Sequence, residues 1–212
     1  AEFDALEQAL AEGLTRLRIP HTVHHRRGGT ARLASVGAGE HDVALVSAGV
    51  AHGLATSDDT ALIRTLPVGT YYAPGRLVVV LRARDDGDQA PQRVAIDRHS
   101  PDHAALTLGE FPDVGAVEFV EMPFPKVPAA VLRGDVDAGI WHITASVIPL
   151  DLAGLATRPL SRSAALKASE RLSRAVLVGW AGRPELTSVL PALPLDDLPS
   201  RQADTLQEDD RA

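Results

Sequence analysis

The stretch Arg93-Val-Ala-Ile-Asp-Arg-His-Ser-Pro-Asp-His103 decides the fold, because it passes from a short apolar run to a helix start. The apolar run predicts a buried strand over 93–97, and Ser100 before Pro101 predicts a capped helix. The first N–H groups of a helix lack intrahelical partners, and the helix dipole is positive at that end. We therefore expect the loop after this strand to form half of a small-molecule site that favours anionic groups.

A later stretch echoes an earlier one. Gly39-Glu-His-Asp-Val-Ala-Leu-Val46 and Gly134-Asp-Val-Asp-Ala-Gly-Ile-Trp141 share the order glycine, acid, any residue, aspartate and then a buried strand. In each we expect the glycine to close a helix and the aspartate to enter the next strand. The echo, with similar helix and strand contexts ahead of both copies, favours two similar α/β lobes over coincidence.

Periodicity predicts the remaining elements. Ahead of the first echo we expect a helix over 3–17, a strand over 21–27 and a helix over 31–36, followed by a strand over 42–47 and a short helix over 50–55. Alternating strands and helices indicate a parallel α/β lobe. Extended segments over 61–66 and 76–82 then flank a turn-rich connection, and 85–91 reads as a polar loop.

The second half of the chain repeats the alternation of strands and helices and then returns to the first lobe. We expect strands over 93–97, 117–121 and 136–141, with helices from Ser100 and over 126–132, then a helix over 163–174, a strand over 175–180 and a short helix from 184 to 190. These elements predict lobe one over 1–68 plus 175–195, lobe two with hinge segments over 69–174, and an acidic disordered tail over 196–212.

Composition excludes several classes. The chain has 212 residues, 45% of them hydrophobic, which suffices for a sizeable core. It has no Cys, and no apolar run approaches the roughly 20 residues of a membrane span. The net charge of −7 disfavours direct binding to nucleic acid. Because the chain starts at Ala1 and has its one Met at 122, we expect residues upstream.

The pattern resembles the type II periplasmic-binding-protein fold, and within it the C-terminal effector-binding domain of YhfZ-like bacterial transcription regulators. The resemblance extends from about Phe3 to Val189, and its motifs are Gly69-Thr-Tyr-Tyr72, Arg93 to Asp102, Val117-Glu-Phe-Val-Glu121 and Gly134 to Trp141. It implies an α/β fold with two lobes joined by crossing hinge strands and a ligand in the interlobe cleft. It also implies a GntR-like winged helix-turn-helix domain upstream, through which alone DNA would be bound.

Ligands of open α/β sheets bind beyond the carboxyl ends of strands. The residues that meet this rule, together with the tyrosines that the resemblance places at the hinge, are the predicted ligand-binding residues: Gly28, Gly29, Thr30, Ser47, Ala48, Gly49, Tyr71, Tyr72, Arg98, His99, Ser100, Trp141 and His142. Arg98 is the predicted anion ligand, since a guanidinium is a forked and permanently charged donor. Some of these residues also have a simpler interpretation: turn glycines, an ordinary helix cap at Ser100, an Asp97–Arg98 ion pair, or core packing of Trp141.

The sequence indicates no metal, cofactor or catalytic residue. The histidines lack metal-ligand spacing, and no nucleophile elbow, phosphate-loop lysine or full dinucleotide fingerprint occurs. We therefore expect a cytoplasmic regulator domain that senses a small polar or anionic metabolite, with a homodimer left open and no membrane contact. The alternatives are an extracytoplasmic solute receptor and an enzyme on the same two-lobed fold.

Overall fold

The computed structural model describes residues 2–54, 58–83, 90–113, 115–143 and 150–209. The chain divides into two compact units: unit 1 comprises 1–73 and 170–212, and unit 2 comprises 74–169. The chain thus passes from unit 1 to unit 2 after Ala73 and returns within the helix α6 (Ser163–Leu172). No described helix combines the length and the apolar composition that a membrane span requires.

Unit 1 contains a three-stranded sheet in the order β1 (Val43–Ser47), β8 (Ala175–Trp180), β2 (Thr60–Thr65). Successive side chains of a strand point to opposite faces of its sheet. Residues 175–179 of the central strand β8 are all buried, so β8 is covered on both faces. Val176 and Val178 pack towards α2 (Gly29–Gly37) and α3 (Ala48–Leu54). Ala175 and Leu177, which point to the opposite face, pack into a second cluster.

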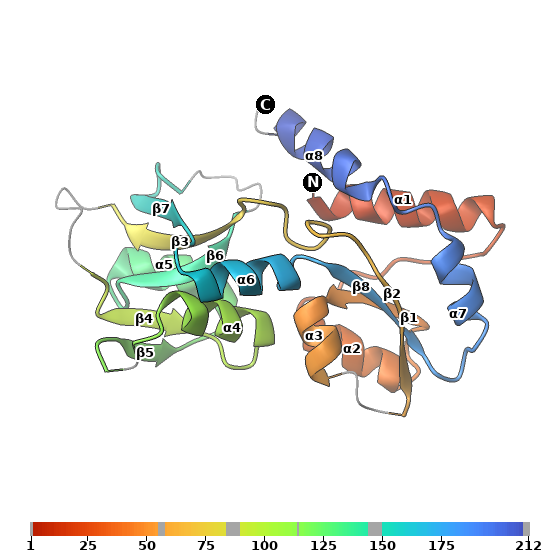
Figure 1. Cartoon of the computed structure of the whole chain (residues 1–212), viewed down its shortest axis with the longest axis horizontal. Helices are drawn as coiled ribbons and strands as arrows, with labels where there is room; N and C mark the ends of the chain where they lie inside the picture. The colour runs from red at the N-terminus through yellow and green to blue at the C-terminus, as the bar shows by residue number, and fades with distance from the viewer. Residues whose placement is uncertain (1, 55–57, 84–89, 114, 144–149, 210–212) are drawn as a thin grey trace. The chain divides into compact units, whose positions relative to one another are not determined.

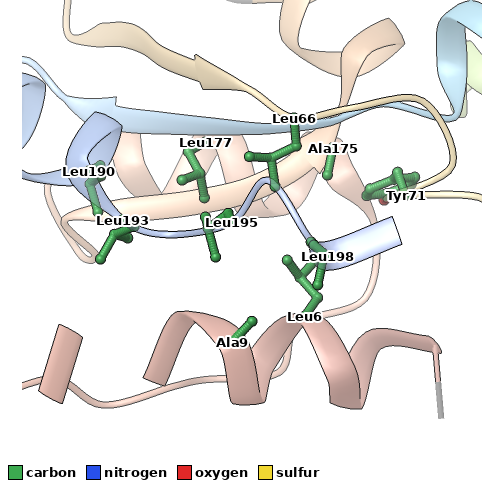
Figure 2. Packing of buried hydrophobic residues seen from close by; sticks show 10 residues of the cluster. All are labelled: Leu6, Ala9, Leu66, Tyr71, Ala175, Leu177, Leu190, Leu193, Leu195 and Leu198. Atoms are coloured by element: carbon green, nitrogen blue, oxygen red, sulfur yellow. The ribbon is translucent and has the colours of Figure 1, made fainter. Parts of the chain in front are cut away.

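That second cluster draws on both ends of the chain (Figure 2). Leu6 and Ala9 of α1 (Glu2–Arg16) meet Leu198 of α8 (Leu198–Asp209), and the helices lie side by side in Figure 1. Between α8 and β8 run α7 (Leu186–Val189) and the short helix η2 (Leu190–Ala192). The predicted disordered tail over 196–212 is therefore wrong for the described residues, because they form α8 and bury Leu198 and Gln202.

Two other predictions for unit 1 are wrong. No strand forms over 21–27, where every residue is exposed and the one aliphatic side chain, Val23, is 48% exposed. The predicted parallel sheet is antiparallel in its described part, since β8 runs opposite to both β1 and β2. The strand between β1 and β2 comes from far along the chain, so local alternation could not reveal its direction.

Unit 2 contains a mixed five-stranded sheet in the order β5-β4-β6-β3-β7. Its strands are β3 (Leu77–Arg82), β4 (Arg93–Ile96), β5 (Glu118–Glu121), β6 (Ala138–His142) and β7 (Leu155–Pro159). β4 pairs in parallel with β5 and β6, whereas β3 pairs antiparallel with β6 and β7. The sequence did not predict β7, and most of the predicted loop over 85–91 lies outside the described residues.

Helices cover the sheet of unit 2. Val127, Ala130 and Val131 of α5 (Val127–Arg133) pack on β3, β4 and β6, and the short helix η1 (Phe124–Lys126) precedes α5. α4 (Pro101–Glu110) contacts β4 and β6. The predicted strands over 93–97 and 136–141, and the helix that starts after Ser100, are confirmed.

The echoed motifs are confirmed as matching helix ends. Gly39 and Gly134 both have positive φ, at 71° and 81°. Each lies in a pair of hydrogen bonds that closes the helix before it: Glu40 N–H to Ser35 O with Gly39 N–H to Val36 O, and the equivalent pair at Asp135 and Gly134. The aspartates that follow lead into β1 and β6.

Candidate functional site

In unit 1 the structure brings together the starts of α2 and α3. A Cβ on Gly29 would lie 2.8 Å from a methyl group of Val50, so glycine permits this close approach. Ser47 is fully buried and its hydroxyl accepts a hydrogen bond from the Val50 N–H at 3.2 Å, which caps α3. The predicted stretches Gly28–Thr30 and Ser47–Gly49 therefore adjoin.

Sequence reasoning missed Arg32, which organises this part of unit 1. From the second turn of α2, its Nη1 donates to Arg26 O at 2.9 Å and its Nη2 to the Tyr71 hydroxyl at 2.6 Å. Its Nε is buried and has no hydrogen-bond partner within the described residues, and no described acid pairs with it. A guanidinium whose partners are all neutral keeps its charge unbalanced.

A signal for this residue was present in the sequence. The stretch from Gly13 to Gly39 contains no Asp or Glu, although the whole chain has a net charge of −7. It contains the following basic residues and histidines: Arg16, Arg18, His21, His24, His25, Arg26, Arg27 and Arg32. Of these, Arg26 pairs with Glu40 at 3.4 Å and His25 with Glu7 at 3.1 Å, on side chains that are largely exposed.

The tyrosines of the first connection belong to unit 1. Tyr71 is 7% exposed within the cluster of Figure 2, and its ring meets that of Tyr72 edge-on at 4.8 Å. The Arg32–Tyr71 hydrogen bond joins α2 to the segment that leads out of unit 1. The predicted hinge tyrosines thus lie just before the chain enters unit 2.

In unit 2, backbone contacts hold the loop after β4. The Asp97 carboxylate accepts the N–H groups of His99 at 3.0 Å and Phe124 at 2.8 Å, one on each oxygen. The Asp97–Arg98 ion pair suggested by the sequence is absent, and Arg98 stays exposed without an ion-pair partner in the described part of the chain. Ser100 caps α4 by accepting the His103 N–H at 3.4 Å, as expected.

His103 ties the ends of two neighbouring strands together. Its Nδ1 accepts the Asp97 N–H at 2.9 Å, and its Nε2 lies 3.2 Å from Ile140 O. These partners require a neutral ring that donates from Nε2. Burial lowers the pKa of His103 to about 4, although the bond to Ile140 O opposes the shift. The carboxyl ends of β4 and β6 are thereby fixed beside each other.

Trp141 lies in this same region. Its ring stacks on Phe124 at 4.7 Å, and Phe124 meets His103 edge-on at 5.3 Å. Trp141 also packs against the cluster under α5, which supports the simpler interpretation of core packing. His142 is buried and pairs with Leu77 across β3 and β6. A ligand role for either residue stays a prediction.

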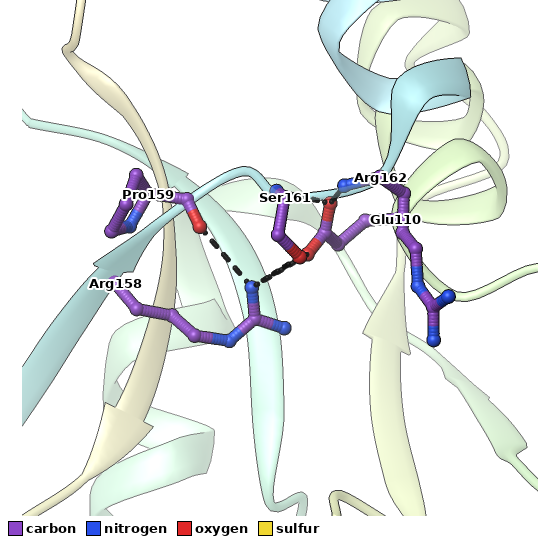
Figure 3. A network of polar contacts seen from close by, with 5 residues as sticks. All are labelled: Glu110, Arg158, Pro159, Ser161 and Arg162. Atoms are coloured by element: carbon purple, nitrogen blue, oxygen red, sulfur yellow. Dashed lines mark hydrogen bonds and ion pairs between the residues drawn. The ribbon is translucent and has the colours of Figure 1, made fainter.

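A buried carboxylate is the centre of a polar network in unit 2 (Figure 3). Glu110, at the end of α4, accepts hydrogen bonds from Arg158 at 2.6 Å, from the Ser161 N–H and hydroxyl at 3.0 and 2.9 Å, and from the Arg162 N–H at 3.1 Å. Burial alone would raise the pKa of Glu110, but these donors outweigh it and lower the pKa. The network anchors the segment that leads into α6.

The described residues contain no cluster of three or more His, Cys, Asp or Glu side chains placed to hold a metal ion. The Asp97 carboxylate at the predicted strand and helix ends is occupied by two backbone N–H groups, and the other polar groups there include N–H donors, hydroxyls and the Arg98 guanidinium. Such groups bind anions or neutral acceptors, and they require no cofactor for that purpose.

The mixed α/β architecture with two sheets is that of periplasmic-binding-protein-like proteins. The chain belongs to the family described as the YhfZ C-terminal domain, whose model matches residues 2–210, as the sequence motifs predicted. It is 29% identical over 161 residues to the YhfZ protein of Escherichia coli K12, which covers 75% of this chain and 52% of that protein. The chain therefore spans about half the length of this relative.

Solved structures share the fold. The crystal structure of YhfZ from Shigella flexneri aligns over 96% of this chain and 86% of its own, with a TM-score of 0.69 and 24% identity. The periplasmic aliphatic sulphonate binding protein SsuA from E. coli aligns over 98% of this chain and 72% of its own, with a TM-score of 0.64 and 16% identity. The periplasmic VFT2 domain of BvgS from Bordetella pertussis aligns over 94% of this chain and 82% of its own, with a TM-score of 0.62 and 17% identity.

Proposed function

We propose that the chain is the ligand-binding sensor domain of a bacterial transcription regulator and that its ligand is a small anionic or polar metabolite. The observation that carries the ligand class is the unbalanced charge of Arg32 on α2, whose guanidinium has only neutral partners in the described part of the chain. A guanidinium without an acidic partner attracts an oxyanion. In this proposal the sensor is cytoplasmic, and DNA is bound only by residues outside this chain.

The names of two structural neighbours support an anionic ligand. SsuA from E. coli is named for aliphatic sulphonates, and SsuA from Xanthomonas axonopodis is described as bound to MOPS. These neighbours are below 20% identity, so they support the fold and only suggest the ligand class. Arg98, exposed and without an ion-pair partner in the described residues, is the proposed second charged contact, from unit 2.

A thermal-shift screen at constant ionic strength tests the ligand class. Phosphate, sulfate, methanesulfonate and acetate are each compared with chloride, and isothermal titration then gives the affinity of the anion that raises Tm most. We expect Arg32→Gln and Arg98→Ala each to weaken binding at least about tenfold, the cost of one charged hydrogen bond. Arg133→Gln removes an exposed charge paired with Asp135 and serves as the control. Undiminished affinity in both site variants would refute the assignment.

The second candidate is an extracytoplasmic solute receptor, which the periplasmic neighbours favour. It predicts the same ligand binding but a different subcellular location. Locating the full-length protein in fractionated cells separates the two: a cytoplasmic, DNA-associated pool supports the regulator, and a periplasmic pool supports the receptor. An enzyme on this fold would instead convert the bound anion, so turnover by the purified chain would replace both proposals.

A further inference from the structure

Both connections between the units are hydrogen-bonded to each other inside unit 1. The outgoing segment, around Thr70, and the returning segment, around Ser173, share the following bonds: Leu66 N–H to Ala175 O at 2.8 Å, Tyr71 N–H to Ser173 O at 2.8 Å, Gly69 N–H to the Ser173 hydroxyl at 3.3 Å, and Ala175 N–H to the Thr70 hydroxyl at 3.0 Å. We call these residues, 66–71 and 173–175, the joint. The joint therefore ties the outgoing and returning segments to each other inside unit 1, a few residues from where the chain passes into and out of unit 2.

The C-terminal helix bonds to the centre of the joint. Gln202 of α8 is 1% exposed, and its Nε2 donates to Thr70 O at 3.0 Å. Thr70 is itself fully buried, and its hydroxyl also donates to Pro67 O at 2.7 Å. A buried carbonyl that loses its donor incurs a desolvation penalty, so this bond strongly favours one arrangement of the joint.

The rest of α8 fixes the position of Gln202. Leu198, one turn earlier, is fully buried against Leu6 and Tyr71. On the outer side, Arg201 makes partly exposed pairs with Glu12 of α1 at 3.0 Å and with Asp197 at 2.9 Å, and such pairs add little to the attachment that the buried residues provide. α8 is therefore attached both to α1 and to the segment of the chain that passes between the units.

We propose that α8 is a lock on the joint: the Gln202–Thr70 hydrogen bond restrains the two connections, and displacement of α8 frees the units to move relative to each other. The same contacts transmit any rearrangement of the joint through α8 to α1. This device needs no bound ligand, so it stands independently of the proposed function. The family match includes α8, since it extends to residue 210.

Amide exchange and a distance measurement test the lock. Gln202→Leu keeps the volume and removes the donor, whereas Arg201→Gln removes the neighbouring ion pairs without touching the joint. We expect Gln202→Leu to speed exchange of the Tyr71 and Ala175 amides at least about tenfold. The chain has no Cys, so dyes placed at Ser188→Cys in unit 1 and Lys126→Cys in unit 2 report the distance between the units by single-molecule energy transfer. We expect a broader distance distribution in Gln202→Leu than in Arg201→Gln.

Unchanged exchange and distances in Gln202→Leu, or equal changes in Arg201→Gln, would overturn the lock. If Gln202→Leu melts α8, Gln202→Glu decides the question. A protonated glutamic acid can donate to Thr70 O and an ionised one cannot, and burial raises the pKa of such a group. Relative to the unsubstituted chain at each pH, Gln202→Glu should exchange faster at the joint at pH 8 and lose most of that excess at pH 5. A pH-independent excess contradicts the proposal.

Discussion

At the scale of single residues, His103 makes the stability of the fold depend on pH. The unfolded chain takes up a proton on this side chain near pH 6.5, whereas the folded chain resists protonation until about pH 4. The unfolded state therefore binds more protons between these values, and acidification destabilises the fold by about 2 kcal/mol at pH 5. Urea unfolding at pH 7 and pH 5 should show this loss in the native chain and not in His103→Gln. Equal losses would contradict the neutral ring.

Glu110 provides a second test at this scale. Replacing it with Gln removes a buried charged acceptor from four donors, and we expect a loss of about 3 kcal/mol in the free energy of unfolding at pH 7. Because the folded pKa lies below the ordinary 4.5, this contribution is present at neutral pH and fades as the pH falls through the folded pKa. Glu118→Gln, which breaks an exposed pair with Arg93, should cost under about 1 kcal/mol. Similar losses in both variants would refute the network.

Residues differ in how far sequence could predict them. Ser100 as a helix cap, and Gly39 and Gly134 as helix ends, follow from local spacing, and the structure confirms them. Arg32 and Glu110 depend on partners about 40 and 50 residues away, and no local pattern identifies such pairs. The acid-free stretch around Arg32 was visible, but only the structure shows which of its arginines is held in place.

At the scale of elements, glycines at a helix end and inside a helix should differ in how much their substitution lowers the free energy of unfolding. Gly134→Ala puts a side chain at φ 81° and against the Arg82 guanidinium, so we expect a loss of about 1–2 kcal/mol. Gly53→Ala is the control, because this α3 residue has no atom within 4 Å of the added methyl. It should leave stability unchanged or raise it by up to about 1 kcal/mol. Denaturant midpoints compare the two, and a tolerated Gly134→Ala would refute the helix-end motif.

Whole elements were predicted where one periodicity dominates. The helix α1 and the strands β4 and β6 follow from their apolar patterns. The sequence failed at α8, whose polar composition suggests disorder while a few leucines and Gln202 dock it on α1 and the joint. It failed also at 21–27, where alternating residues have no neighbouring strand to pair with. In both cases the outcome depends on whether distant parts of the chain supply a partner, which α8 has in α1 and the joint.

At the scale of the whole molecule, the sequence motifs correctly identified the family and its periplasmic-binding-protein-like fold. The thirteen predicted ligand residues stay a prediction, although within each unit the structure gathers most of them at neighbouring strand and helix ends. Their distribution over both units is the central claim: one anion should contact residues of unit 1 and of unit 2.

Backbone amide shifts during a titration test this claim most directly. The isotope-labelled chain is titrated with the anion that raises Tm most in the screen, and shifts are followed at Gly28–Thr30, Ser47–Gly49, Arg98–Ser100 and Trp141–His142. The account predicts that amides of both units move and saturate with one dissociation constant, and that Arg32→Gln weakens both responses together. Shifts confined to one unit, or two unrelated constants, would contradict it.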